Sequence, residues 1–154
     1  YSIDGTTLNI TANGIYHIMG SCNEGNISVA KSLSDVGLVL DNLSLTSTST
    51  APIVIKKNSS VLITLTGTSI LTDNEDASLD GVDDNFEGAS IKVKSGSTLK
   101  INGSGSLLIK GNTKNGVRRR RIDFRLVRAI LENVYDDLML RYVDRVEAEM
   151  QKYK

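Results

Sequence analysis

The sequence contains an internal repeat of short apolar runs separated by turn residues. Residues 51–74 align with residues 89–112, and Ile53 falls on Ile91 in this alignment. An earlier copy of the same spacing of apolar residues begins near Ile27. Apolar and polar residues alternate within each run, which places every second side chain on one face of an extended strand. The spacers are rich in Gly, Asn and Ser, as is typical of turns.

Each unit holds three apolar runs and is too short to bury a core of its own. Stacked units can bury one continuous column of side chains. The equal spacing favours an all-β right-handed parallel β-helix (solenoid), in which Ile53 stacks on Ile91 and Ile55 stacks on Val93. A two-sheet β-sandwich is the alternative, because it also has short strands at regular spacing.

The two ends of such a solenoid are exposed sheet edges that need a cover. The first stretch, residues 1–21, alternates like a pair of strands, and we expect it to cap the first coil. At the other end, Gly116 and Val117 fall where Ala89 and Ser90 would recur, but the repeat stops. We therefore place the boundary of the β-helix domain at residue 116.

The segment 117–154 differs in composition from the repeat, since every arginine of the chain lies in it. Its apolar residues recur near the helical period, and neither Gly nor Pro interrupts them. The pattern predicts one long C-terminal α-helix, which must bury its apolar face. We expect a homo-oligomer formed through Val127, Leu131, Val134, Leu138, Tyr142 and Val146. A cap on the terminal coil, docking on another protein, and a fusion or splice near residue 117 are alternatives.

Three stretches of the repeat resemble a known family. They are GTTLNITANGIYHIMGS, VGLVLDNLSLTSTSTAPIVIKKNSSVLITLTGTSILTD and STLKINGSGSLLIKGNTKNG. Together they resemble secreted bacterial carbohydrate-binding β-helix proteins, best known from cellulolytic clostridia, over nearly all of residues 1–116. The resemblance implies a secreted or cell-surface protein with calcium bound along a parallel β-helix. It also implies non-catalytic binding of plant cell-wall polysaccharides, notably acidic, pectin-type ones. The sequence departs from the family after Gly116, where further coils usually follow.

The stretch DNEDASLDGVDDNFEG, residues 73–88, is rich in acids and contains an insertion, residues 75–88, between two aligned units. Calcium prefers carboxylate and carbonyl oxygens, so such a loop can suit it, although the spacing is not that of an EF-hand. A solvated, mobile acidic loop is the alternative. Together with the resemblance, the loop gives these candidate calcium ligands: Asp73, Asn74, Asp76, Asp83, Asp84 and Glu87.

Three lysines suggest how the repeat could bind an acidic glycan. Lys56 and Lys94 share one repeat position, and Lys92 lies two residues away on the same outward face. Their ammonium groups can act as point charges toward carboxylates, although ordinary solubilising lysines are the alternative. Stacking on neutral sugars has little support, because Phe86 is the single Phe, Tyr or Trp within residues 17–123.

Other classes of function have weaker support. His17 is the one histidine and Cys22 the one cysteine, so a catalytic triad, a cysteine metal cluster and an internal disulfide lack members. The basic run 118–121 is diluted by the acids that follow it, and no apolar run is long enough to span a bilayer. We therefore expect no enzyme and neither nucleic acid nor membrane as partner. The prediction is a calcium-supported polysaccharide-binding module, with a structural subunit of an extracellular fibre or surface layer as the alternative.

Overall fold

The computed structural model describes residues 1–119, which belong to the first compact unit of the chain. The predicted C-terminal helix beyond residue 119, and with it Val127, Leu131, Val134, Leu138, Tyr142 and Val146, lies outside the described residues. No helix within residues 1–119 is long and apolar enough to cross a membrane.

Almost every regular element of the described chain is a β-strand. The strands are β1 (Ser2–Asp4), β2 (Thr7–Ile10), β3 (Gly14–Cys22), β4 (Asn26–Val29), β5 (Val36–Ser47), β6 (Ile53–Ile55), β7 (Ser60–Thr66), β8 (Thr68–Asp73), β9 (Ala89–Val93), β10 (Thr98–Gly103), β11 (Ser106–Gly111) and β12 (Asn115–Arg119). A single 3₁₀ turn, η1, covers Ala77–Leu79 within these residues.

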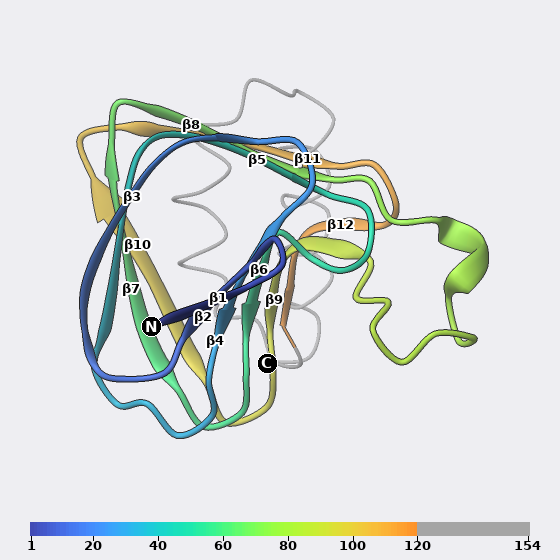
Figure 1. Ribbon diagram of the computed structural model, residues 1–154, viewed down its shortest axis with the longest axis horizontal. Coiled ribbons are helices and arrows are strands. Elements are labelled where there is room, and N and C mark those ends of the chain that lie inside the picture. Colours follow the sequence, from blue (N-terminus) through green and yellow to red (C-terminus); the bar gives the residue numbers. More distant parts are fainter. Residues whose placement is uncertain (120–154) are drawn as a thin grey trace, which may run out of the picture. The chain divides into compact units, whose positions relative to one another are not determined.

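The strands form two sheets. One has the order β1-β2-β4-β6-β9-β12, and the other has the order β10-β7-β5-β8-β11, with β3 paired to β5. All pairs are parallel except β1 with β2. Figure 1 shows β4, β6 and β9 side by side, with β7 and β10 across from them. The unit 51–74 thus adds β6 to the first sheet and β7 and β8 to the second, and the unit 89–112 adds β9 to the first and β10 and β11 to the second.

The register of the first sheet confirms the predicted stacking of aliphatic side chains. Ile53 pairs with Ile91, and Ile55 pairs with Val93. On the other side of Ile53 lies Ile27, from the preceding unit. All five side chains are buried. The period-2 alternation of the sequence therefore identified the inward face correctly, and burial of these columns is the main favourable term in folding.

The predicted fold class, a right-handed parallel β-helix followed by one long C-terminal α-helix, is wrong. The described residues form two sheets that make a half-barrel, and they contain no α-helix. The three apolar runs expected of each unit do not make three sheets, because β5 is one strand of 12 residues that pairs with both β7 and β8. Alternation shows which side chains point inward, but it does not show where the chain leaves one sheet for another.

The bend within β5 depends on one residue in the left-handed conformation. Asn42 has a φ of 49°, and its side-chain oxygen accepts a hydrogen bond from the backbone N–H of Thr68 at 3.0 Å. Gly67, between β7 and β8, lies so close that a Cβ there would stand 2.4 Å from the same oxygen. The backbone N–H of Leu43 is satisfied by Ser69 Oγ at 3.1 Å. These contacts fix the point at which β7 ends and β8 begins.

The repeat also continues further than predicted. Asn115 pairs with Ala89 and Val117 pairs with Ile91, so β12 adds one more strand to the first sheet. The predicted helix start at Val117 is therefore wrong for residues 117–119, which are strand. The prediction set Ala89 on Gly116, whereas Ala89 pairs with Asn115, so the recurring strand was placed one residue too late.

Candidate functional site

The insertion between β8 and β9 is closed at its base by Glu75. The carboxylate of Glu75 accepts hydrogen bonds from the backbone N–H groups of Glu87 and Gly88, each at 2.8 Å. Burial raises the pKa of Glu75, the two backbone donors oppose this shift, and the neighbouring Asp73 adds to it. Glu75 thus ties the start of the insertion to its end and fixes the backbone position of Glu87.

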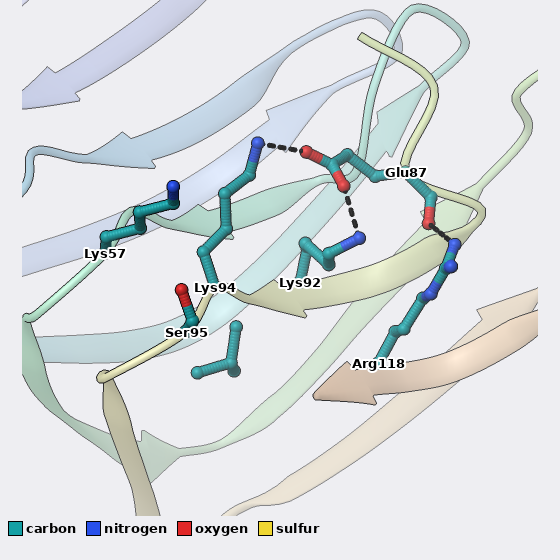
Figure 2. Close-up of a pocket in the computed structure, with 7 residues that line it drawn as sticks. Lys57, Glu87, Lys92, Lys94, Ser95 and Arg118 are labelled. Atoms are coloured by element: carbon teal, nitrogen blue, oxygen red, sulfur yellow. Dashed lines mark hydrogen bonds and ion pairs between the residues drawn. The ribbon is translucent and has the colours of Figure 1, made fainter. Parts of the chain in front are cut away.

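Glu87 holds cationic side chains of two neighbouring strands (Figure 2). Its carboxylate lies 2.5 Å from Nζ of Lys92, on β9, and 2.7 Å from Nζ of Lys94, the residue directly after β9. Its backbone carbonyl accepts a hydrogen bond from Nη1 of Arg118 on β12 at 3.1 Å. Arg118 is also the register partner of Lys92, and strands in a sheet lie about 4.8 Å apart. The first sheet therefore presents a compact group of cations on its outer face.

These side chains line a pocket of about 510 Å³, which we call the basic pocket. Its lining residues are Lys57, Glu87, Lys92, Val93, Lys94, Ser95 and Arg118. Four cations and one carboxylate leave the lining with a net charge of about +3. Lys57 and Arg118 are exposed, and the Lys94 side chain is 36% exposed, whereas that of Lys92 is 17% exposed. Three cations can therefore reach a ligand, and Lys92 serves mainly to hold Glu87.

Two of the three predicted glycan-binding lysines, Lys92 and Lys94, come together in the basic pocket. Lys56 is exposed and does not line it, whereas its neighbour Lys57 does. Sequence reasoning missed Arg118, because the basic run was assigned to the segment after the repeat. The signal that could have found it is the recurrence of the apolar position at Val117, which places the next residue on the outward face.

Several acids of the insertion have local structural roles. Asp76 accepts a hydrogen bond from the backbone N–H of Ser78 and caps η1, and this bond lowers its pKa. Asp83 accepts one from the backbone N–H of Asn85 at 2.8 Å. Asp84 is exposed. Such turn caps are the common use of short acidic side chains in loops.

The remaining predicted calcium ligands do not gather around one point. Asn74 accepts a long hydrogen bond from Asn112 at 3.4 Å, and Glu87 is occupied by its two lysines. Asp73 is fully buried. Its Oδ1 accepts a hydrogen bond from the N–H of Glu75, and its Oδ2 has no hydrogen-bond partner among residues 1–119. In residues 1–119, no three His, Cys, Asp or Glu side chains converge to hold a metal ion. The predicted set does not fit a single calcium ion, and calcium plays no part in the function proposed below.

The fold and the basic pocket define an all-β protein with a cationic site on the face of a parallel sheet. The family model of carbohydrate-binding domain-containing proteins matches residues 4–122. The chain therefore belongs to this family. This confirms the predicted resemblance to carbohydrate-binding proteins, without the calcium-binding β-helix that the resemblance also implied.

One relative is a carbohydrate-binding domain-containing protein of Acetivibrio thermocellus, which is 34% identical over 120 residues. The match covers 75% of this chain and 41% of the relative, so the chain spans less than half of that protein's length. No solved structure matches the chain.

Proposed function

We propose that the chain is a non-catalytic module that binds an acidic polysaccharide, with the glycan carboxylates held in the basic pocket. The single observation that carries this proposal is the convergence of Lys57, Lys94 and Arg118 on one pocket of the outer sheet face. Membership of a carbohydrate-binding family supplies the class of ligand, and the charge of the pocket supplies the kind of sugar.

The residues that line the basic pocket favour an anionic sugar over a neutral one. Sugar rings without charge are commonly bound on exposed aromatic faces, and the pocket lining contains no aromatic ring. Phe86, which lies close in sequence, is instead contacted by the ammonium of Lys114, 6.0 Å from the ring centre. Carboxylates, by contrast, match both the ammonium of Lys94 and the planar fork of Arg118.

A polymer fits this site better than a single sugar. Each exposed ion pair contributes only about 0.2–1 kcal/mol, so one uronate would be held weakly. A chain with a carboxylate on every sugar places the next carboxylate at high effective concentration once the first is bound. The positive field of the pocket also speeds the encounter with a negative polymer, more so at low salt. We therefore expect weak binding of monomers and firm binding of the polymer.

Affinity electrophoresis through gels that contain polygalacturonate, or its fully methyl-esterified form, tests the proposal. The two polymers share a backbone and differ in charge. We expect retardation by the acid form and none by the ester. The double variant Lys94→Met/Arg118→Met should weaken binding about tenfold, which corresponds to about 1.4 kcal/mol for two lost contacts.

The matched control is Lys100→Met/Lys110→Met, which removes two exposed lysines from β10 and β11 of the other sheet. It changes the net charge by the same amount, and we expect it to leave retardation nearly unchanged. Equal retardation by the ester, or an equal loss in the control variant, would show that the basic pocket is not the binding site.

A further inference from the structure

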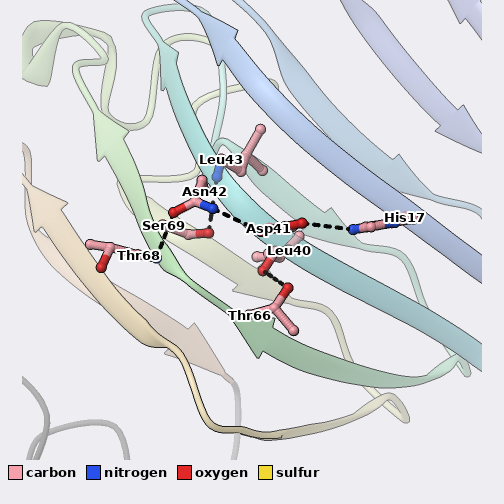
Figure 3. A network of polar contacts seen from close by, with 8 residues as sticks. All are labelled: His17, Leu40, Asp41, Asn42, Leu43, Thr66, Thr68 and Ser69. Carbon is pink, nitrogen blue, oxygen red and sulfur yellow. Dashed lines mark hydrogen bonds and ion pairs between the residues drawn. The ribbon is translucent and has the colours of Figure 1, made fainter.

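One edge of the second sheet lacks the usual protection of an edge strand. Within residues 1–119, β3 pairs with β5 on one side and with no strand on the other. It is anchored to β5 along its length, and His17 Nε2 lies 3.2 Å from Asp41 Oδ2 (Figure 3). Its sequence, GIYHIMGSC, contains no Lys, Arg, Asp or Glu. Natural proteins usually blunt such an edge with charged residues, because its free N–H and C=O groups can pair with another chain.

Apolar side chains are exposed around the same edge. The exposed fractions are 73% for Tyr1, 70% for Ile3, 81% for Ile15 and 61% for Met19. Within residues 1–119, the expected cap by residues 1–21 thus leaves these apolar side chains exposed. Exposed apolar surface that is concentrated in one place commonly marks an interaction site.

A cavity of about 320 Å³ opens at this end of the stack. Its walls include Ile3, Leu8, Ile18, Leu43 and Leu45. In register, Ile18 lies beside Leu40, which is fully buried, whereas Ile18 itself is only half-buried. Among residues 1–119, no layer of side chains therefore covers the end of the buried column here.

The opposite edge of the same sheet is built differently. There β10 and β11 each carry an exposed lysine, Lys100 and Lys110. Leu108, at 40%, is the one large apolar side chain of these two strands that is prominently exposed. Charges on an edge disfavour strand addition. The far edge is therefore a poor partner for the apolar edge at β3.

We propose that the β3 edge of one copy pairs with the β3 edge of a second copy. A two-fold axis makes two identical edge strands antiparallel and satisfies the free backbone groups of both. It also sets apolar surface against apolar surface and closes the open cavities of the two copies. Such an interface uses the same patch twice and ends at a dimer, whereas pairing of β3 with the far edge would continue into a filament.

The test uses sedimentation velocity of the full chain over a wide range of concentrations, with amide hydrogen exchange of β3 measured at both ends of the range. We expect a monomer–dimer equilibrium and slower exchange of β3 amides at high concentration. The variant Ile15→Lys/Met19→Lys should weaken the dimer at least 100-fold, because four lysines would meet on adjacent strands. Both positions are exposed, so the fold should tolerate the change.

The control variant, Leu62→Lys/Leu108→Lys, changes two exposed leucines of β7 and β11, and we expect it to leave the dimer intact. Three results would overturn the proposal. They are a monomer at all concentrations, a dimer that persists in the β3 variant without protection of β3 amides, and particle growth beyond a dimer that the control variant stops.

Discussion

The carboxylate of Glu87 lies 2.7 Å from the ammonium of Lys94, and the Glu87 side chain is only 7% exposed. Glu87, which lies at the end of the insertion between β8 and β9, thus lines the basic pocket together with its cations. Without it, Lys92 on β9 and Lys94 directly after β9 would present two like charges close together. Glu87 therefore orients the lysines, at the cost of one positive charge of the pocket.

Replacement of this acid should destabilise the fold. In Glu87→Gln, Lys92 keeps a mostly buried ammonium without its counter-ion, and we expect a loss of about 1–3 kcal/mol in the free energy of unfolding. Urea denaturation measures it. The control is Asp80→Asn, which breaks the exposed pair of Asp80 with Lys114 and should cost less than about 1 kcal/mol. Similar losses in the two variants would show that Glu87 has no special structural role.

The pH dependence of stability should show the environment of Glu75. Burial raises its pKa in the folded protein above the ordinary value of 4.5, so the folded state binds the proton more tightly than the unfolded state. This stabilising contribution is complete below pH 4.5 and is lost as pH rises through the folded pKa. The unfolding free energy of the wild type, minus that of Glu75→Gln, should therefore fall with rising pH above 4.5.

Asp76 provides an internal comparison of opposite sign. The hydrogen bond from Ser78 lowers the pKa of Asp76 below its ordinary 3.8, so its contribution is present above pH 3.8 and is lost as pH falls. The corresponding difference for Asp76→Asn should rise with pH in this lower window. A flat or rising difference curve for Glu75→Gln above pH 4.5 would contradict the burial described for Glu75.

Two buried serines should respond in opposite directions to removal of their hydroxyl groups. Ser47 Oγ is buried and has no hydrogen-bond partner in the described part of the chain, so Ser47→Ala should be neutral or stabilising by up to about 1 kcal/mol. Ser69 Oγ accepts the backbone N–H of Leu43, and Ser69→Ala should destabilise by about 1–3 kcal/mol. Thermal and urea unfolding would check both, and destabilisation by Ser47→Ala would indicate an unrecognised partner such as an enclosed water.

Removal of calcium should leave the fold unchanged. Glu87 is neutralised by the protein's own lysines, and Asp80 is paired with Lys114. We therefore expect the same melting temperature in EGTA and in millimolar calcium. A melting temperature that falls on chelation would contradict this expectation. It would point to Asp73, whose Oδ2 is the buried carboxylate oxygen without a hydrogen-bond partner in the described chain.

Much of the core could be predicted from the sequence, because alignment and alternation both place Ile53 over Ile91. The division into sheets could not, since it depends on the conformation of Asn42 and its contacts with the next unit (Figure 3). Only some of the residues that line the basic pocket could be predicted. Lys92 and Lys94 share a face by period alone, whereas Arg118 joins them only through the register of β12 on β9. The role of Glu87 depends on the folded path of an insertion, which no local pattern specifies.

The central claim is that glycan carboxylates bind in the basic pocket, and a titration monitored by NMR tests it most directly. Oligogalacturonate would be added to isotope-labelled protein while the Lys Nζ, Arg Nε and backbone N–H signals are followed. We predict the largest shifts at Lys57, Lys94 and Arg118, with little change on the outer face of β7 and β10. Shifts that spread over all lysines, or that centre on the other sheet, would contradict it.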